Sequence, residues 1–384
     1  MAWLFWLSLT GIGYTYVGYP LLIRGLARLW PRPVRKGAIT PTVSVLIAAH
    51  NEIADIGRKL DSVLEQDYPA DRFEILVGAD GCTDNTEGVV ERLMKREPGK
   101  PIRLHRFPTR IGKPSVLNAL VPHATGEILV FTDARQALDR RAIRRLVENL
   151  ADPLVGCVSG ELELTEDPSS FVGEGLGAYW EYEKSLRLAE SQTGSMLGAT
   201  GALYAIRKTL YRPLDPRTLL DDVEIPLAII AQGVRAVFEP SALAYDTLAR
   251  SGRAEFRRKV RTLAGNYQTF IRHARLLGPG SPIAWQLWSH KVFRTLVPFW
   301  LLALLIASVR LPGPLYRAAT WAQVAGYGLA GLGAVGESLR QPWLGGRLGR
   351  MAYVFCLLNV GAVVGLIRFL RSQQPITWEK AHER

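Results

Sequence analysis

The sequence predicts an α/β domain with a mostly parallel sheet, joined to membrane-spanning helices at both ends of the chain. Two observations lead to this prediction. From Pro41 onward, short apolar runs alternate with helix-like segments, which is the pattern of a parallel sheet covered by helices on both faces. At both ends, apolar segments approach the roughly 20 residues that a helix needs to cross a bilayer.

The composition of the 384-residue chain excludes several classes of protein. With 48% hydrophobic and 21% charged residues, it is too apolar for a disordered chain, although its net charge is +12. Its three cysteines are odd in number and far apart, which excludes a disulfide framework and a zinc site built from cysteines.

The amino-terminal segment 2–23 carries no charge and is rich in tryptophan and tyrosine. The basic residues that follow it belong in the cytoplasm by the positive-inside rule. A cleaved signal peptide is disfavoured, because there the basic residues would precede the apolar run. We therefore predict a membrane helix over 1–24 and a basic linker over 25–40.

The carboxy-terminal part contains three further apolar segments, at 292–309, 318–335 and 351–367. We predict transmembrane or re-entrant helices over 292–370, the re-entrant form suiting the first segment because it contains Arg294. A basic tail follows over 371–384. Helices buried in a soluble protein are the alternative, against which basic flanks and interfacial aromatic residues argue. The prediction is a multi-pass protein of the plasma (inner) membrane with its middle domain in the cytoplasm.

The middle of the chain is expected to form the sheet. Because buried parallel strands read as continuous β-branched runs, we predict strands at 42–49, 73–79, 102–107 and 128–132, with helices at 53–65 and 139–150 and a more irregular half from 155 onward.

Polar side chains follow three of these strands, namely His50-Asn51-Glu52, Asp80 and Asp133. Ligands bind beyond the carboxyl ends of parallel strands, so we expect a cleft lined by these groups. The sequence contains no GxGxxG fingerprint after its first strand, no Walker A motif and no GxSxG elbow, which argues against dinucleotide binding, a P-loop and a serine hydrolase.

Seven segments, taken in order, resemble the family 2 inverting glycosyltransferases with the GT-A fold. They are VSVLIAAHNE at 43–52, DGCTD at 80–84, GKPSVLN at 112–118, FTDAR at 131–135, GATGALYAIR at 198–207, LDD at 220–222 and RKVRT at 258–262. The chain looks like the membrane-integrated branch that includes cellulose, chitin and hyaluronan synthases, and the tail segment TWEK at 377–380 is similar to relatives' tails. The resemblance implies a GT-A domain over 41–250, followed by basic interfacial helices over 251–291.

A nucleotide-diphosphate sugar is the donor that this resemblance implies, with UDP as the family's common nucleotide. Asp80 can accept hydrogen bonds from the base, and His50, Asn51 and Glu52 are placed for the nucleoside. For Asp80 the alternative is a turn-forming residue before glycine, and Asp84 is expected to cap a helix. Lys113 is expected to neutralise phosphate, with a solvated surface lysine as the alternative.

Asp133 stands at the place of the family's DxD motif, so a Mg²⁺ or Mn²⁺ ion between this carboxylate and the diphosphate is implied. The second acidic residue of that motif is replaced by Arg135. Arg135 is expected either to contact phosphate directly or to lie on the surface.

Asp222 is the predicted general base, because inverting transfer needs a carboxylate to take the proton of the acceptor hydroxyl. Asp221 beside it, with Thr200 and Gly201, is expected on the acceptor side. Asp221 and Asp222 also open an amphipathic segment, so a helix-capping pair is the alternative.

Arg258 and Arg261 belong to a basic stretch that is predicted to face the diphosphate. Contact with anionic lipids is the alternative interpretation, worth about 1 kcal/mol per residue. Nucleic acid is not an expected partner, because the stretch adjoins apolar segments and lacks a recognisable binding module.

Processive relatives carry a tryptophan where this chain has Thr262. We therefore predict transfer of one or a few sugars to a lipid-linked or other membrane-proximal glycan acceptor. A processive polysaccharide synthase is the first alternative, and a catalytically degenerate membrane scaffold is the second.

Overall fold

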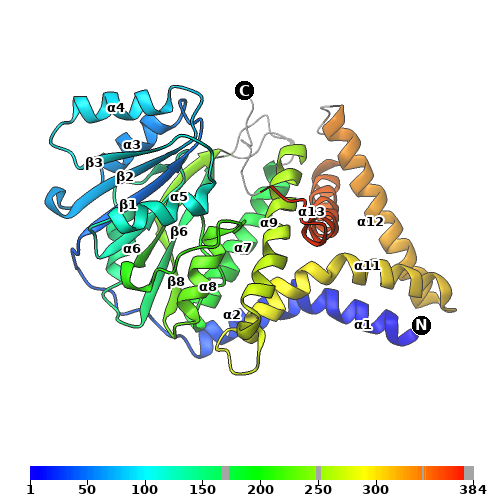
Figure 1. Ribbon diagram of the computed structural model, residues 1–384. Coiled ribbons are helices and arrows are strands. Elements are labelled where there is room, and N and C mark those ends of the chain that lie inside the picture. Colours follow the sequence, from blue (N-terminus) through cyan, green and yellow to red (C-terminus); the bar gives the residue numbers. More distant parts are fainter. Residues whose placement is uncertain (166–172, 248–251, 340, 342, 376–384) are drawn as a thin grey trace.

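A computed structural model describes residues 1–165, 173–247, 252–339, 341 and 343–375. An eight-stranded sheet in the order β3-β2-β1-β4-β7-β6-β8-β5 forms one side of the molecule, and long helices form the other (Figure 1). The strands are β1 (Val43–Ala49), β2 (Phe73–Asp80), β3 (Ile102–Phe107), β4 (Ile128–Phe131), β5 (Ala137–Leu138), β6 (Val155–Thr165), β7 (Tyr204–Arg207) and β8 (Arg235–Thr247). The predicted strands are confirmed to within a residue or two.

The sheet is mixed, although most of its strands are parallel. Strands β3, β2, β1 and β4 are parallel to one another, and β6 is parallel to β8. Strand β7 runs antiparallel to both β4 and β6, and the short β5 is antiparallel to β8. The reversal at β7 is the part of the topology that the strand–helix alternation did not predict.

Helices cover both faces of the sheet because successive side chains of each buried strand point to opposite sides. Val45 and Ile47 of β1 pack with α3 (Ile56–Leu64), α4 (Thr86–Arg96) and α6 (Ala142–Asn149). Leu46 and Ala48 face the other way and pack with α5 (Lys113–Leu120) and α8 (Asp221–Ile230). Because β1, β2 and β4 are parallel, their carboxyl ends meet at one edge of the sheet, as expected.

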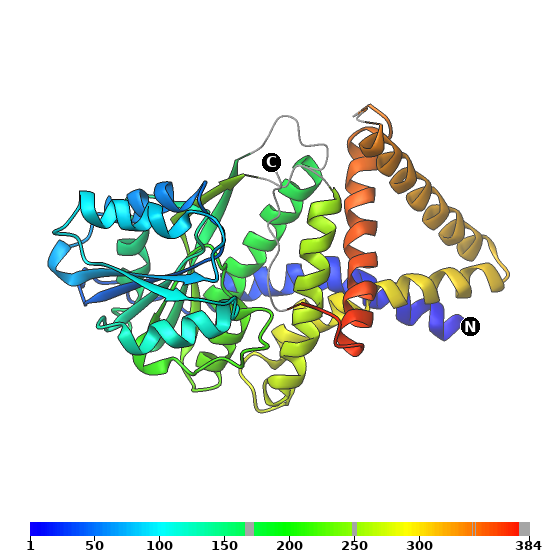
Figure 2. The same ribbon diagram turned by 45° about the horizontal axis from the view of Figure 1, so that its top comes forward.

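The helical side is built from both ends of the chain. Helices α7 (Gly173–Thr193) and α9 (Gly252–Arg272) lie between the sheet and the carboxy-terminal helices (Figures 1 and 2). Helix α13 (Gly346–Leu370) packs closely on α9, since a Cβ added to Gly365 would lie 3.0 Å from the backbone nitrogen of Ala264. The other helical elements are α1 (Ala2–Gly13), the π-helical turn η1 (Tyr14–Gly18), α2 (Tyr19–Leu29), α10 (Ala284–Gln286), the π-helical turn η6 (Leu287–Val292), α11 (Phe293–Arg310) and α12 (Pro314–Ser338), with short 3-10 turns η2 (Ala70–Arg72), η3 (Val121–His123), η4 (Lys208–Leu210) and η5 (Ala274–Leu277).

Two helices of the described chain, Ala284–Arg310 and Gly346–Leu370, are long and apolar enough to cross a membrane. They correspond to the first and third predicted carboxy-terminal segments. The predicted amino-terminal span lies in the helical segment α1-η1-α2, and the segment 318–335 lies in α12; neither is among the two. Residues 376–384, which include most of the predicted basic tail and its TWEK segment, lie outside the described residues.

Candidate active site

Three carboxylates and one lysine meet beyond the end of β4. The ammonium of Lys113, in the first turn of α5, lies 2.8 Å from Oδ1 of Asp133 and 2.9 Å from Oδ2 of Asp221. Burial alone would lower the pKa of Lys113, but the negative charges of Asp133, Asp221 and Asp222 outweigh burial and hold this pKa well above its usual range. Lys113 therefore carries a permanent positive charge in the centre of the site.

Asp222 stands in the first turn of α8, facing the same space. Its Oδ2 accepts a hydrogen bond of 3.1 Å from the backbone N–H of Gly201. Burial, together with the adjacent charge of Asp221, raises the pKa of Asp222 to about 6. A carboxylate with this pKa is ionised near neutral pH and is a stronger proton acceptor than an ordinary aspartate.

Gly201 keeps the space between the carboxylates open. A Cβ at this position would lie 3.3 Å from Oδ2 of Asp133, 3.3 Å from Oδ2 of Asp222 and 3.7 Å from the amine of Lys113. Thr200 lies beside it, buried, with its backbone N–H bonded to the Ser159 hydroxyl at 3.0 Å. Thr200 and Gly201, both predicted on the acceptor side, thus line the cavity next to the carboxylates.

Asp80 has a different environment from the other carboxylates. It is fully buried, and its two oxygens accept hydrogen bonds from the backbone N–H groups of Ile111, at 2.6 Å, and Gly112, at 3.0 Å. Asp80 does not line the cavity that contains Lys113 and Asp133. In this structure, Asp80 holds the loop that leads to Lys113. Its contact with a nucleobase stays a prediction.

The side chains of the residues that follow β1 also form hydrogen bonds with other parts of the protein. The Asn51 side chain, at a backbone φ of 55°, accepts from the N–H of Thr83 at 2.7 Å and donates to its hydroxyl at 2.9 Å. His50 Nδ1 lies 2.6 Å from the carbonyl oxygen of Asp80. Asp84 accepts from the first N–H of α4 at 3.0 Å, as expected of a cap, and Glu52 lines the cavity.

Arg135 lines the cavity, and its guanidinium is held by Asp246 at the end of β8, with N–O distances of 3.1 and 2.5 Å. The arginine at the second position of the DxD segment therefore has a carboxylate partner of its own. No sequence signal pairs these two residues, because they are separated by more than 100 positions.

Arg258 and Arg261 both line the cavity from α9, but they are held differently. Arg258 is bound to the buried carboxylate of Glu255, with its Nη2 at 2.6 Å, and lies over the ring of Trp180. The Nε of Arg261 is buried without a hydrogen-bond partner among the described residues. Of the two predicted phosphate contacts, Arg261 thus has the greater need for an anion.

Two residues that the sequence analysis missed hold the site together. Lys59 of α3 is fully buried and donates hydrogen bonds to the Thr132 hydroxyl and, at 2.9 Å, to the Gln136 carbonyl, which brace the turn carrying Asp133. Burial lowers the pKa of Lys59 to about 7, and the nearby charge of Asp133 opposes this shift. A lysine in an amphipathic helix gives no signal of such burial.

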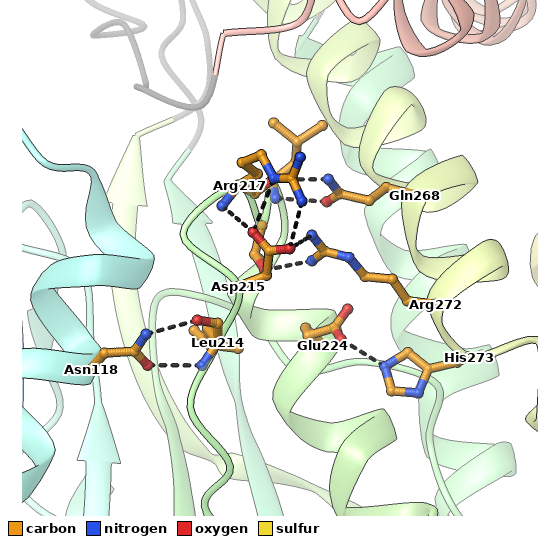
Figure 3. Close-up of polar contacts among 10 residues, drawn as sticks. Asn118, Leu214, Asp215, Arg217, Glu224, Gln268, Arg272 and His273 are labelled. Atoms are coloured by element: carbon orange, nitrogen blue, oxygen red, sulfur yellow. Dashed lines mark hydrogen bonds and ion pairs between the residues drawn. The ribbon is translucent and has the colours of Figure 1, made fainter.

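Asn118 is the second missed residue, although it ends the GKPSVLN segment. It donates to the carbonyl of Leu214 at 2.7 Å and accepts from the N–H of Leu214 at 2.8 Å (Figure 3). On the other side of the same loop, Arg272 binds Asp215 at 3.0 Å, and Gln268 bonds the backbone of Arg217 at 2.8 Å. These contacts with α5 on one side and α9 on the other hold the loop that leads into Asp221 and Asp222.

One cavity of about 1560 Å³ is lined by Asp133, Asp221 and Asp222 together with Lys113, Arg258 and Arg261. A single small-molecule site usually has about 300–1,000 Å³, so this cavity has room for two ligands. It brings together most of the predicted site residues, Asp133, Asp221, Asp222, Lys113, Arg135, Arg258, Arg261, Thr200, Gly201 and Glu52; of the remainder, His50, Asn51 and Asp80 do not line it.

Several known proteins are similar to this chain in sequence. The model of the family described as "Glycosyltransferase like family 2" matches residues 41–265. The chain is 24% identical over 249 residues to "Probable glycosyltransferase YdaM" of Bacillus subtilis (strain 168), covering 60% of this chain and 57% of the relative. It is also 24% identical over 267 residues to "Beta-monoglucosyldiacylglycerol synthase" of Synechocystis sp., covering 67% and 55%. The chain thus spans a little over half the length of these relatives.

A solved structure matches nearly the whole chain. The "Mannosyltransferase PcManGT from Pyrobaculum calidifontis in complex with GDP-Man and Mn2+" superposes with a TM-score of 0.74, covering 96% of this chain and 99% of that one at 24% identity. At this identity the likeness shows the fold, so the expected GT-A-like architecture is confirmed.

Proposed function

Because the chain belongs to the glycosyltransferase-like family 2, we propose that it transfers a sugar from a nucleotide-diphosphate sugar to a lipid-linked or other membrane-proximal acceptor. The observation that carries the proposal is the grouping of Lys113, Asp133, Asp221 and Asp222 around the open space at Gly201. A cavity with a fixed cation and a carboxylate of raised pKa suits the departure of a diphosphate and the deprotonation of a hydroxyl.

The donor is proposed to lie with its diphosphate between Lys113 and Arg261. Lys113 is a fixed ammonium at the wall of the cavity, and Arg261 enters from α9 with a buried N–H to satisfy. Both charges stabilise the negative charge that develops on the leaving diphosphate. UDP is the proposed nucleotide by resemblance.

Asp222 is the proposed general base. Its ionised carboxylate takes the proton of the acceptor hydroxyl while that oxygen attacks the anomeric carbon from the side opposite the diphosphate. The Gly201 N–H fixes one oxygen of Asp222, at 3.1 Å, and leaves the other for the hydroxyl. Asp221, bound to Lys113, holds the lysine in position.

A divalent cation fits the space beside Asp133. The Asp133 side chain is 41% exposed. Because Gly201 has no Cβ, there is room next to the Oδ2 atom of Asp133. Among the described residues, no group of three or more His, Cys, Asp or Glu is arranged to hold a metal ion by itself, so the diphosphate and water would complete the coordination, as is usual for Mg²⁺. When bound, Mg²⁺ or Mn²⁺ neutralises diphosphate charge.

The acceptor side is proposed to face the membrane, with the α/β domain in the cytoplasm beneath the plasma (inner) membrane. Helices Ala284–Arg310 and Gly346–Leu370 are the candidate spans, and the exposed apolar side chains of α1, such as Trp3 and Leu7, suggest that it also contacts lipid. A processive synthase remains the alternative within this class.

A donor screen tests the proposal. Purified full-length protein is offered UDP- and GDP-sugars with membrane lipid extracts, with and without Mg²⁺ or Mn²⁺, and products are detected by transfer of radioactive sugar. The expected result is a single labelled lipid product that the Asp222→Asn variant does not form. A wild-type protein that binds no nucleoside diphosphate would favour the scaffold instead.

A further inference from the structure

Helix α13 is one of the two described helices that are long and apolar enough to cross a membrane, yet one of its faces lies on a charged helix. A Cβ added to Gly361 would lie 4.0 Å from Cβ of Lys259, and one added to Gly365 would lie 3.2 Å from the carbonyl oxygen of Val260. Since residues four positions apart share one face of a helix, this face of α13 packs directly on the basic helix α9.

The same part of α13 borders the active-site cavity. The lining includes Arg258 and Arg261 of α9 together with Val354, Phe355, Leu358 and Ala362 of α13. If α13 lay in the hydrocarbon core, these arginines would be drawn towards lipid, where a charged side chain costs about 3 kcal/mol or more. The contact with α9 therefore favours a position for α13 at the surface of the membrane.

The outer face of α13 is apolar and exposed. Val360 is 53% exposed and Ile367 is 43% exposed, and residues at this spacing lie on one side of a helix. Arginines stand at both ends of α13, with Arg347 and Arg350 near its start and Arg368 near its end. An apolar face between basic ends suits a helix in the membrane interface, where arginine contacts lipid headgroups. In a spanning helix, one of these basic ends would lie outside, against the positive-inside rule.

Helices α1, α11 and α12 have a different character. The segments 2–23, 295–309 and 318–336, which lie in α1-η1-α2, α11 and α12, contain no charged residue. They expose apolar side chains such as Trp3, Leu302 and Trp321. At about 1.5 Å per residue, the uncharged segment of α12 approaches the roughly 30 Å of hydrocarbon in a bilayer. Its glycines and aromatic residues reduce the mean hydropathy of α12 without adding charge, and both kinds of residue are common in membrane helices.

The directions of the helices agree with this division. Helix α1 lies antiparallel beside α11, because Gly11 lies against Trp300 whereas Phe5 packs with Leu304 and Ala307. Figures 1 and 2 show that α13 runs across the direction of this pair, so the two candidate spans do not share one direction through a bilayer. The amino terminus lies near the turn between α11 and α12, at the end of the molecule away from the sheet (Figure 1).

We propose that α1, α11 and α12 cross the bilayer, while α13 lies along its cytoplasmic surface and borders the cavity there. This arrangement places the amino terminus and the α11–α12 turn outside, and both ends of α13 on the same side as the α/β domain. An acceptor in the membrane then reaches the cavity at the depth of the lipid headgroups. The inference rests on the membrane placement in the proposed function, and not on the transfer reaction itself.

Side-specific cysteine labelling tests the arrangement. The three free cysteines of the full-length protein are first removed by Cys82→Ala, Cys157→Ala and Cys356→Ala. Single cysteines are then introduced at exposed positions, namely Lys100→Cys in the α/β domain, Pro312→Cys in the α11–α12 turn, Gln341→Cys before α13 and Ser372→Cys after it. A membrane-impermeant maleimide is applied to inside-out and to right-side-out membrane vesicles.

Lys100→Cys is the control for the cytoplasmic side, and Gln341→Cys and Ser372→Cys are expected to react as it does, in inside-out vesicles and not in right-side-out ones. Pro312→Cys is expected to react only in right-side-out vesicles. If Ser372→Cys and Gln341→Cys react from opposite sides, α13 spans the membrane and the proposal is wrong. Reaction of Pro312→Cys from the same side as Lys100→Cys would also overturn it, because α11 and α12 would then not cross.

The depth of each helix gives a second test that does not depend on the labelling. A fluorophore attached at Val360→Cys of α13 should be quenched more strongly by lipids that carry a nitroxide near the headgroup. One attached at Leu329→Cys of α12 should be quenched more strongly by a nitroxide near the end of the acyl chain. The reverse order would contradict the proposal. Failure of the proposed membrane placement itself would look different, because the protein would then not float with lipid vesicles in a density gradient.

Discussion

Asp80 and Asp133 end the two strands that flank β1, yet the protein uses their carboxylates differently. Asp80 is fully buried, and both of its oxygens bind backbone N–H groups of the loop before α5. Asp133 has 41% of its side chain exposed and faces an open cavity beside Lys113 and Asp222. The difference teaches that one strand end supports the loop that presents Lys113 and the other faces the cavity, although the two look equivalent in the sequence.

The largest effect on activity is expected at Asp222, on the cavity side of this comparison. Asp222→Asn should lower kcat by at least about 10²-fold, because general base catalysis contributes 10²- to 10⁴-fold, while the Kd for the donor changes little. Glu224→Gln is the control on the same helix, outside the cavity, and should cost less than about 10-fold. A fully active Asp222→Asn enzyme would contradict the assignment of the base.

Asp133→Asn should weaken donor binding and reduce the response to Mg²⁺ or Mn²⁺, with kcat/KM falling by about 10²-fold. Its melting temperature should stay close to that of the wild type, because the side chain is half exposed. Kinetics over a range of cation concentrations, with a thermal melt in parallel, separate the two effects. A large loss of stability would show that Asp133 builds the site instead.

Asp80→Asn, in contrast to Asp133→Asn, should lower the stability of the protein. The amide can replace only one of the two acceptors for the N–H groups of Ile111 and Gly112, so the free energy of unfolding should fall by about 1–3 kcal/mol. Denaturant unfolding measures this loss. If Asp80 instead acts through the nucleobase, the variant will keep its stability and raise the KM for one nucleotide selectively.

The rise of kcat on the acidic side of the pH profile should report Asp222. Since its pKa is raised to about 6, kcat should rise as pH increases through 6 and then level off. Below about pH 4 the Asp222 carboxyl is protonated in both the folded and the unfolded state, and the fold keeps its full stability. As pH rises through 6 that stability is lost, because the buried carboxyl ionises less readily than the same group in the unfolded chain. Asp222→Asn should therefore melt higher than the wild type at pH 8, with the difference disappearing near pH 4. A flat rate profile between pH 5 and 8 would exclude Asp222 as the base.

Much of the fold and part of the site could be predicted because they depend on local patterns. Buried β-branched runs located the strands to within a residue or two. The family resemblance, and not the topology, placed Lys113, Asp221 and Asp222 in the same site as Asp133. The antiparallel β7 could not be predicted, because its short run resembles any other buried strand. Of the predicted membrane spans, the tryptophan- and tyrosine-rich amino-terminal segment and the glycine-rich α12 are not among the two described helices that are long and apolar enough to cross a bilayer.

The supporting contacts were beyond sequence reasoning because each one joins distant segments. Arg135 forms an ion pair with Asp246, and Lys59 donates a hydrogen bond to the turn that carries Asp133. Asn118 is hydrogen-bonded to the loop before α8. None of these residues stands in a periodic pattern that reveals its partner. The same limit explains why the backbone partners of Asp80 were not predicted, while its contact with the base stays a prediction.

The central claim is that the space around Gly201 holds the diphosphate of an activated sugar. The most direct measurement is an experimental structure of the full-length protein with a nucleoside diphosphate and Mn²⁺. The account predicts the diphosphate within hydrogen-bonding distance of Lys113 and Arg261, with Asp133 facing the cation. A nucleotide bound on another surface, away from Asp133 and Asp222, would contradict it.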